Sequence, residues 1–313
     1  MTSERDTSDA SGITQGHQRL KELTATPATA YAPGAGFPPL AVGLAEAHTT
    51  TGPKTESITI SLVLHEQADM AQSLLDDLAH HCASEPLNIA LTLNVAEALP
   101  FDPAQFPFPI RVVRNRAPKG FSANHNAALM RADGETGFFC VLNPDLRIVD
   151  NPFPALRQAA ATTEVGIAAP LVRDPEGEVA DNARRVPTPK RLAARYLRRR
   201  NRRLEYSGQP DERSPEWVAG MCLFMRSEVF RELGGFDEKF YLYMEDVDIC
   251  LRARFRGYDV ALVPEAEIIH QARRQSHRHG RYLLWHLSSL ARFYGSTVFL
   301  RYLLRGAPRV RVR

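Results

Sequence analysis

The chain has 313 residues, 44% of them hydrophobic and 24% charged, which is typical of a soluble globular protein with one large core or two smaller ones. Its four cysteines lie far apart without a Cys-x-x-Cys pair, which argues against a zinc cluster and indicates reduced thiols. No run reaches the roughly 18 apolar residues of a membrane-spanning helix, and the polar N-terminus lacks a signal-peptide core, so we expect a cytoplasmic protein.

The formal charge is only +3, but basic residues are concentrated in two segments. These are residues 190–203, KRLAARYLRRRNRR, and the C-terminal RYLLRGAPRVRVR at 301–313. Basic clusters of this kind bind phosphates, nucleic acid or an anionic membrane surface. A solvated helix face has the same composition, so both interpretations stay open.

Residues 1–54 are rich in Thr, Ala, Gly, Pro and Ser without a hydrophobic period, which predicts a mostly disordered leader. Between residues 55 and 172, apolar runs with β-branched residues alternate with segments of helical periodicity. Such strands, apolar almost throughout, predict a parallel sheet covered by helices on both faces. The predicted strands are residues 57–65, 88–95, 110–115, 136–145 and 165–172, and the predicted helices are residues 70–78, 122–131 and 152–162.

The second half of the chain has a different pattern. Its basic segment, residues 184–214, has few apolar residues, which predicts a mobile excursion from the domain. In chain order we then predict a strand at 216–226, a short helix at 227–236 stopped by Gly234 and Gly235, a helix through Arg256, a strand at 258–264 leading to His270, and an amphipathic helix at 277–304.

Three carboxylates, Glu245, Asp246 and Asp248, stand at the start of the helix that runs through Arg256. Acidic residues are stabilised at a helix N-terminus by the free amides and the helix dipole, so capping alone is one explanation. Asp248 is also placed to pair with Arg252 one helical turn later. Catalysis is the other explanation, and the rest of the chain must decide between them.

Asn143 and Asp145 follow a predicted strand in the run VLNPDL. In open α/β sheets, ligands bind at the carboxyl ends of the strands. A carboxylate at this position suits Mg²⁺ or Mn²⁺ bound to a diphosphate, because these cations take one or two protein carboxylates and add phosphate oxygens and water. An ordinary Pro-Asp turn is the alternative.

Four motifs stand in order along the chain: RNRAPKGFSANHNAAL at 114–129, VLNPDL at 141–146, WVAGMCLFMRSEVFRELGGFDEKFYLYMEDVDICLRARFRGYDVALVPEAEIIH at 217–270, and LLWHLSSLARFY at 283–294. Together they resemble the family 2 glycosyltransferases, and within them the bacterial rhamnosyltransferase-like members, over roughly residues 57–300. The resemblance implies a GT-A fold, an α/β architecture in which a Rossmann-like nucleotide-binding half joins an acceptor-binding half around one mixed, mostly parallel sheet. The catalytic domain is then residues 55–275, and residues 276–313 form a C-terminal amphipathic helix and basic tail.

The resemblance further implies transfer of a sugar from a nucleotide-activated donor to a hydroxyl, with inversion of the anomeric centre. Asp246 is then the expected base that takes the acceptor proton, and Glu245 is its neighbour that binds acceptor hydroxyls. Asp145 matches an acidic position of the family's metal motif, Asn143 stands where many relatives have Asp, and His270 matches a histidine that completes the site in some relatives. A divalent cation, Mg²⁺ or Mn²⁺, is therefore the expected cofactor.

The nucleotide contacts implied by the resemblance are matched less closely. The turn KGFSANHN should lie beneath the donor, where free amides of the next helix can face a phosphate. The first strand ends in His65 and Glu66, where the family has Tyr-Asn or a similar pair, and Asn94 replaces an acidic residue that normally reads the nucleobase. The expected nucleotide-sugar contacts are His65, Glu66, Asn94, Gly120, Phe121, Asn124, Asn126 and Asn143.

The expected partners are a UDP- or dTDP-sugar, with rhamnose as one candidate sugar, and a saccharide or lipid-linked saccharide of cell-surface polysaccharide synthesis. A lipid-linked acceptor favours peripheral attachment to the inner face of the cell membrane through the C-terminal helix and its arginines. The altered nucleobase contacts also leave open a non-catalytic, glycosyltransferase-like scaffold. A nucleic-acid-binding protein is disfavoured, because no nucleic-acid module is recognisable and the aromatic residues are not interleaved with the basic runs.

Overall fold

The computed structural model of the chain describes residues 56–131, 137–197, 205–206, 209, 214–271 and 280–308. The predicted leader, residues 1–54, lies outside the described residues, as do the arginine run at 198–203 and the last five residues of the basic tail.

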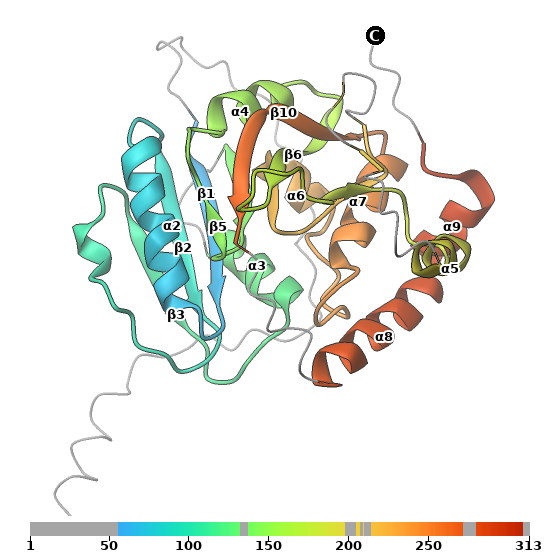
Figure 1. The fold of residues 1–313 in the computed structure, drawn as a ribbon, viewed down its shortest axis with the longest axis horizontal. Coiled ribbons are helices and arrows are strands. Elements are labelled where there is room, and N and C mark those ends of the chain that lie inside the picture. The colour runs from blue at the N-terminus through green and yellow to red at the C-terminus, as the bar shows by residue number, and fades with distance from the viewer. Residues whose placement is uncertain are drawn as a thin grey trace, which may run out of the picture. The chain divides into compact units, whose positions relative to one another are not determined.

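The described residues fold around an eight-stranded sheet (Figure 1), whose strands are β1 (Ile58–Leu64), β2 (Leu87–Leu93), β3 (Ile110–Arg114), β4 (Phe138–Leu142), β5 (Leu146–Arg147), β6 (Val165–Arg173), β9 (Cys222–Arg226) and β10 (Asp259–His270). Their order across the sheet is β3-β2-β1-β4-β9-β6-β10-β5. β9 runs antiparallel to β4 and β6, and β5 runs antiparallel to β10, whereas the other neighbouring pairs are parallel. The mixed, mostly parallel sheet predicted from the sequence is therefore confirmed.

Helices cover both faces of this sheet (Figure 1). α2 (Ala68–His81) and α4 (Phe153–Ala160) pack into the apolar core on one face. α3 (Phe121–Met130), α6 (Ser227–Glu232) and α7 (Glu245–Phe255) pack into the core on the other. Alternate residues of the central strands enter the two cores, which is why these strands form nearly unbroken apolar runs in the sequence.

A short ribbon stands beside the sheet, where β7 (Ala183–Arg184) pairs antiparallel with β8 (Trp217–Val218). The sequence predicts a single strand over residues 216–226, and this prediction is wrong. The chain leaves β8, turns at residues 219–221 and only then enters the sheet as β9. The turn occurs at Gly220, and it frees the amide of this residue for the site described below.

A 3₁₀ turn, η1 (Pro103–Gln105), follows β2. The basic segment contributes the helix α5 (Pro189–Leu197). The Glu216 carboxylate accepts hydrogen bonds from the Val186 amide at 2.6 Å and from the Arg191 guanidinium at 2.9 Å. These bonds fasten the start of the segment to the domain, and the mobility predicted for the whole of it stays a prediction.

The C-terminal helix predicted at 277–304 is two helices, α8 (Gly280–Tyr294) and α9 (Thr297–Arg305). The break falls at Ser296, whose side-chain oxygen caps α9. Within the described part of the chain, no helix is long and apolar enough to cross a membrane.

Candidate active site

Several predicted site residues follow directly after β1, β2 and β4, whose carboxyl ends lie at one edge of the sheet (Figure 1). The antiparallel β9 begins at this edge, opposite the end of β4. The strand predicted at 258–264 is longer than expected, since β10 continues past an irregular pairing between Val263 and Glu267 and brings His270 to the same edge, beside β5. Ligands of open α/β sheets bind at such an edge.

The acidic helix α7 begins after a turn with an unusual backbone. Tyr243 and Met244 have φ angles of 71° and 70°, in the left-handed region that non-glycine residues rarely adopt. Each such residue costs of order 1–3 kcal/mol, and the conformation persists only where neighbouring structure holds it. Glu245 follows directly, so the turn determines how α7 presents its first carboxylates.

Helix α8 supplies part of this support. The Ser289 hydroxyl donates a 2.8 Å hydrogen bond to the Leu242 carbonyl. The ring of His286 lies edge-on to that of Tyr243, with the ring centres 5.1 Å apart. Residues more than forty positions later in the chain therefore hold the acidic turn in place.

Asp246 lies at the second position of α7 and is partly exposed. Its Oδ2 accepts a 3.1 Å hydrogen bond from the Gly220 amide, and its Oδ1 accepts one of 2.9 Å from the Val247 amide. Burial raises the pKa of Asp246 above that of an ordinary aspartate, although these hydrogen bonds act in the opposite direction. A higher pKa makes the carboxylate a stronger base, so the predicted base is both oriented and strengthened.

Glu245 has different surroundings. Its side chain is buried, and its Oε2 has no hydrogen-bond partner among the described residues. Burial, followed by the negative charge of Asp246, raises the pKa of Glu245 well above that of an ordinary glutamate. Asp248 instead forms the predicted ion pair with Arg252, at 2.7 Å, which confirms that interpretation of the third carboxylate.

Asp145 and His270 meet where β5 pairs with the end of β10. The Nε2 atom of His270 lies 3.1 Å from Asp145 Oδ2, and the Gln271 amide donates to the Asp145 carbonyl at 2.8 Å. The other carboxylate oxygen, Oδ1, is buried and has no hydrogen-bond partner among the residues that the structure describes. The sequence-predicted metal ligands are therefore brought together.

The turn at residues 219–221 connects Asp246 with the Asp145–His270 pair. The Gly220 amide bonds to Asp246, and the carbonyl of the next residue, Met221, accepts a 2.9 Å hydrogen bond from the Asn143 amide. Asn143 stands two residues before Asp145, so the predicted base and the predicted metal ligands belong to one connected site.

A divalent cation fits the Asp145–His270 pair. A carboxylate and an imidazole are suitable donors for Mn²⁺, and the unpartnered Oδ1 is an oxygen that a cation would satisfy. Across residues 56–131, 137–197, 214–271 and 280–308, no three His, Cys, Asp or Glu side chains gather as a metal site. Two protein ligands suffice for cations that complete their shell with phosphate oxygens and water.

A network of asparagines connects the ends of β2 and β3 with α3. The Asn94 side-chain oxygen accepts hydrogen bonds from Asn115 at 2.9 Å, from the Lys119 amide at 2.8 Å and from Asn124 at 3.1 Å. Its nitrogen donates to the Lys119 carbonyl at 2.9 Å and lies 3.3 Å from His65 Nδ1. The Asn94 amide is therefore fully used inside the protein, where it orients its neighbours. Asn115 was not singled out in the sequence, although its place directly after a strand is the signal that could have found it.

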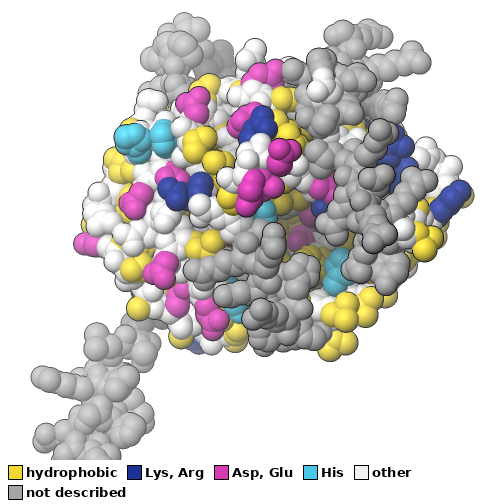
Figure 2. Space-filling model, viewed as in Figure 1, with side chains coloured by type: hydrophobic (Ala, Val, Ile, Leu, Met, Phe, Trp, Pro, Cys, Tyr) yellow, Lys and Arg dark blue, Asp and Glu magenta, His cyan; other side chains and the backbone are white. Residues whose placement is uncertain are grey.

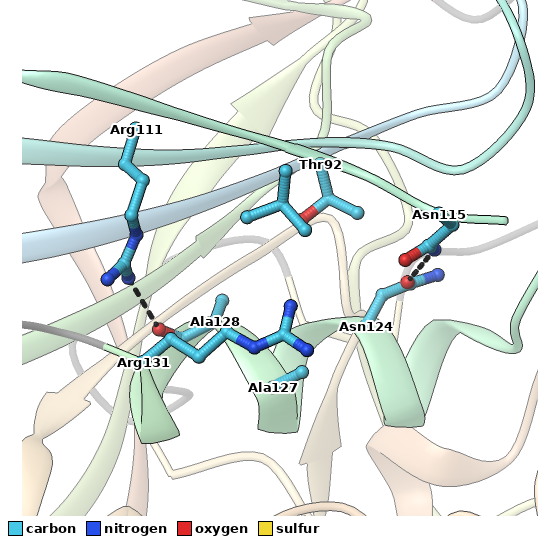
Figure 3. A pocket seen from close by; sticks show the side chains of 8 residues that line it. Thr92, Arg111, Asn115, Asn124, Ala127, Ala128 and Arg131 are labelled. Atoms are coloured by element: carbon cyan, nitrogen blue, oxygen red, sulfur yellow. Dashed lines mark hydrogen bonds between the residues drawn. The ribbon is translucent and has the colours of Figure 1, made fainter. Parts of the chain in front are cut away.

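A pocket extends from this network along β3 and α3 (Figure 3). The Asn115–Asn124 hydrogen bond, 2.8 Å long, lies at one end of the pocket and Arg111 lies at the other (Figure 3). The side chain of Arg131 also lines it, so the pocket has two positive charges. Its lining is Thr92, Arg111, Val113, Asn115, Asn124, Ala127, Ala128 and Arg131.

Gly120 and Phe121 connect this side of the site to the acidic turn. A Cβ atom on Gly120 would lie 2.7 Å from the Tyr241 carbonyl oxygen, which is closer than real Cβ atoms come. The Phe121 amide donates a 2.8 Å hydrogen bond to the same oxygen. The position therefore needs glycine because two backbones meet there, and a phosphate contact stays a prediction.

Two further predicted nucleotide contacts have partners within the protein. Asn126 is buried on α3, where its side chain bonds both the amide and the carbonyl of Phe236 at 2.9 Å. Glu66 has a φ of 61°, and its amide donates to the Glu97 carboxylate at 3.1 Å. The Glu97 carboxylate, which the sequence pattern did not indicate, also accepts hydrogen bonds from the backbone amides of Gln67 and Ala68, and so caps α2. Asn126 and Glu66 thus act on the shape of the site.

Residues 92–286 match the protein family described as "Glycosyltransferase like family 2". The chain belongs to this family. The matched span is more than half of the chain and contains the acidic turn, the Asp145–His270 pair and the asparagine network. The family predicted from the sequence motifs is therefore confirmed.

Two curated proteins resemble the chain over part of its length. It is 36% identical over 162 residues to an N-acetylglucosaminyl-diphospho-decaprenol L-rhamnosyltransferase of Mycobacterium tuberculosis, which covers 48% of this chain and 50% of that protein. It is 33% identical over 79 residues to Rhamnosyltransferase WbbL of Escherichia coli K12, which covers 25% of this chain and 30% of that protein. The chain thus spans about half the length, or less, of these relatives.

Solved structures of similar fold confirm the GT-A prediction. GalNAc-T7 with UDP, GalNAc and Mn²⁺ superposes with a TM-score of 0.53 at 15% identity, covering 69% of this chain and 43% of that one. The mannosyltransferase PcManGT from Pyrobaculum calidifontis, with GDP-Man and Mn²⁺, gives a TM-score of 0.52 at 15% identity, covering 89% and 71%. At this identity the likeness concerns the fold alone.

Proposed function

We propose that this chain is an inverting glycosyltransferase that moves a sugar from a nucleotide-sugar to a hydroxyl of a saccharide or lipid-linked saccharide. The observation that carries the proposal is the partly exposed Asp246 carboxylate, oriented by the Gly220 amide at the ligand-binding edge of the sheet. Membership of the glycosyltransferase-like family 2 supports the class of reaction. Rhamnose is our first candidate sugar, because two of the relatives are named rhamnosyltransferases.

An inverting transfer is a single displacement at the anomeric carbon, in which the acceptor oxygen forms a bond as the nucleoside diphosphate leaves. Asp246 takes the proton of the attacking hydroxyl. Its two backbone hydrogen bonds fix the carboxylate, and its raised pKa makes it a stronger base than an ordinary aspartate. Glu245 is proposed to bind acceptor hydroxyls through the Oε2 atom that lacks a partner among the described residues.

Asp145 and His270 are the residues that would hold Mg²⁺ or Mn²⁺. A bound cation supplies positive charge against the negative charge that develops on the departing diphosphate. Asn143, anchored by its backbone beside them, is proposed to contact the donor near this group. The presence of Mn²⁺ in two solved structures of similar fold supports the assignment.

The nucleotide is proposed to lie over the ends of β1 and β2, against His65, Asn115 and Asn124. Asn94 acts by orienting these side chains, since its own amide is fully used. The side-chain nitrogens of Asn115 and Asn124 already donate within this network. The Asn115 oxygen is therefore proposed to accept a hydrogen bond from the edge of a pyrimidine, and UDP- and dTDP-sugars are the candidate donors.

The acceptor is proposed to be lipid-linked, and the protein to attach peripherally to the inner face of the cell membrane. The relative from Mycobacterium tuberculosis is named for a decaprenol-linked acceptor. In this chain α8 and α9 expose leucines, among them Leu283, Leu284 and Leu304, and hydrophobic side chains gather over the start of α8 in Figure 2. Exposed leucines beside arginines suit an anionic membrane surface.

A donor screen tests the proposal. The full chain would be incubated with UDP- and dTDP-sugars, Mn²⁺ and a lipid-linked saccharide, and the released nucleoside diphosphate measured. We expect acceptor-dependent release with one donor and its loss when EDTA removes the cation. Asp145→Ala should weaken nucleotide binding and abolish its dependence on the cation. Absence of acceptor-dependent release with every donor would contradict the proposal and favour a non-catalytic scaffold.

A further inference from the structure

Arg184 lies near the proposed base, and Arg195 shares a carboxylate partner with it. Arg184 ends β7 and stands opposite Trp217 in the pairing with β8. Beyond β8 the chain reaches Gly220, whose amide bonds to Asp246. The Ala219 amide also bonds the backbone just before β7 at 2.7 Å, so β7 and the Gly220 turn are fastened together. The ribbon therefore fixes Arg184 close to the start of α7.

Arg184 is oriented by two contacts. Its Nε donates a 2.9 Å hydrogen bond to Asp181, and its guanidinium carbon lies 5.4 Å from the centre of the Trp217 ring. Its two terminal nitrogens have no hydrogen-bond partner among the described residues, and 30% of the side chain is exposed. A guanidinium held by one nitrogen and one face presents its remaining donors to a ligand.

The second arginine shares the same carboxylate. Arg195 on α5 bonds the other oxygen of Asp181, and its side chain is 39% exposed. The Asp181 carboxylate thus bonds two guanidinium groups. The segment that follows it, residues 182–204, has ten basic residues and no acidic one. The pair keeps an excess of positive charge. The charge of Arg184 acts on the base, since it opposes the effect of burial, which raises the pKa of Asp246.

We propose that Arg184 and Arg195 form a diphosphate-binding site next to the base, and that its ligand is the diphosphate of the acceptor. This inference rests on the proposed function. Guanidinium groups bind phosphate oxygens through paired N–H donors. A diphosphate held at Arg184 would leave its attached sugar next to Asp246, which takes the proton of a hydroxyl on that sugar. No bond is made or broken at the arginines themselves.

The donor also has a diphosphate, which the proposed function assigns to the cation held by Asp145 and His270. Consecutive residues of the turn, Gly220 and Met221, bond to Asp246 and to Asn143 respectively. The turn therefore contacts the proposed base through Gly220 and the loop that leads to the proposed cation ligands through Met221. A donor diphosphate bound to that cation would leave the arginines to the acceptor.

Calorimetry with inorganic diphosphate, without divalent cation, tests the site on the full chain. Arg184→Gln should weaken binding roughly 10- to 100-fold, because a charge-assisted hydrogen-bond pair is lost. The diphosphate affinity of Arg184→Lys should lie between those of wild type and Arg184→Gln, since lysine keeps the charge without the forked donors. Arg256→Gln is the matched control. Arg256 is exposed and lies 3.9 Å from Glu232 at the far end of α7, so its replacement should leave the diphosphate affinity unchanged. Equal diphosphate affinity in wild type and Arg184→Gln would overturn the site.

Kinetics with two synthetic acceptors identify the source of the diphosphate. They carry the same saccharide, one on an alkyl diphosphate and the other as a plain alkyl glycoside. Arg184→Gln should raise the KM of the first about tenfold or more, and change neither the KM of the second nor the affinity for UDP or dTDP with Mn²⁺. A loss of nucleotide affinity with both KM values unchanged would make the acceptor assignment wrong. Calorimetry needs no turnover, so an inactive protein that binds diphosphate through Arg184 would refute the proposed function and keep the site.

Discussion

At the scale of single residues, the first turn of α7 separates three carboxylates by their surroundings. Asp246 accepts two backbone hydrogen bonds and reaches solvent, Glu245 is buried with an unpartnered oxygen, and Asp248 is paired with Arg252. Burial raises the pKa of both Glu245 and Asp246, and that of Glu245 well above its usual range. Neighbouring carboxyl groups with different surroundings can divide the work, one as proton acceptor and one as hydroxyl ligand.

The variant Asp246→Asn tests the proton acceptor. The amide keeps the shape of the side chain and an oxygen for the Gly220 amide, but it cannot take a proton, so kcat should fall by about 10²–10⁴-fold or more. Nucleotide affinity, measured by calorimetry, should stay close to wild type. In wild type, kcat/KM should rise with pH through the raised pKa of Asp246, above the range of an ordinary aspartate. Turnover of the variant within tenfold of wild type would show that Asp246 is not the proton acceptor.

The variant Glu245→Gln tests the buried carboxyl through stability. Burial raises the pKa of Glu245 in the folded chain, while the unfolded chain has an ordinary glutamate. The folded state therefore binds this proton more tightly, and its stability is lost as the pH rises from the ordinary value through the raised one. Thermal unfolding at about pH 5 and pH 8 should show a smaller fall in Tm for the variant than for wild type. The same fall in both would mean that Glu245 titrates normally.

At the scale of elements, the strained turn before α7 is held from several directions. α3 touches it through Gly120, α8 through Ser289, and the break between β8 and β9 reaches α7 through Gly220. The contacts of α3 and α8 are with the backbone of the turn, whereas the Gly220 amide orients the Asp246 carboxylate itself. A site supported in this way can position a base within the small tolerance that catalysis requires.

The variant Gly120→Ala tests the contact between α3 and the turn. The new Cβ would lie 2.7 Å from the Tyr241 carbonyl oxygen and 2.9 Å from its Cα, so the turn must move and take Asp246 with it. We expect a loss of kcat on the order of 10²-fold, because small displacements of catalytic groups have effects of this size. Gly295→Ala is the control, since its Cβ would meet nothing closer than 3.6 Å. Equal kcat values for both variants, with both folded by circular dichroism, would show that the close approach is not needed.

Much of this arrangement could be predicted from the sequence, because buried parallel strands form apolar runs and ligands gather where those strands end. The turn at 219–221 could not, since its residues continue an apolar run without a polar interruption. The extension of β10 to His270 was missed because Pro264 usually ends a strand. Asn115 and Glu97 were missed because single polar residues after strands are common, and only their contacts distinguish them.

At the scale of the whole molecule, the net charge is small, but basic and acidic residues are unevenly distributed along the sequence. Residues 182–204 and 268–313 together have twenty of the 39 basic residues and no acidic residue, so the rest of the chain is strongly acidic. The two basic segments meet in the structure, where Arg191 on α5 bonds the Tyr302 hydroxyl on α9 at 2.8 Å, and Figure 1 shows these helices side by side. Positive charge gathered where α5 meets α9 would orient the protein toward an anionic surface.

The last prediction concerns that surface. Leu283, Leu284 and Leu287 on α8 are 60%, 68% and 52% exposed, although the opposite face of the helix holds the acidic turn. Membrane contact would therefore bring a lipid-linked acceptor near the base. In flotation, the full chain should bind vesicles with anionic lipid but not purely zwitterionic ones, and high salt should release it, since each basic residue contributes about 1 kcal/mol near the surface.

Replacing the three leucines with serine should reduce this binding, while Val149→Ser, a change at a 55% exposed residue outside α8, should not. Truncation after Pro308 removes three arginines of the tail and should lower the salt concentration that releases the protein. Recovery in the soluble fraction with both kinds of vesicle would mean that α8 and the arginines of the tail do not attach the protein to a bilayer. Binding that survives the leucine changes but not high salt would assign attachment to charge alone, and would leave the exposed face of α8 without a membrane role.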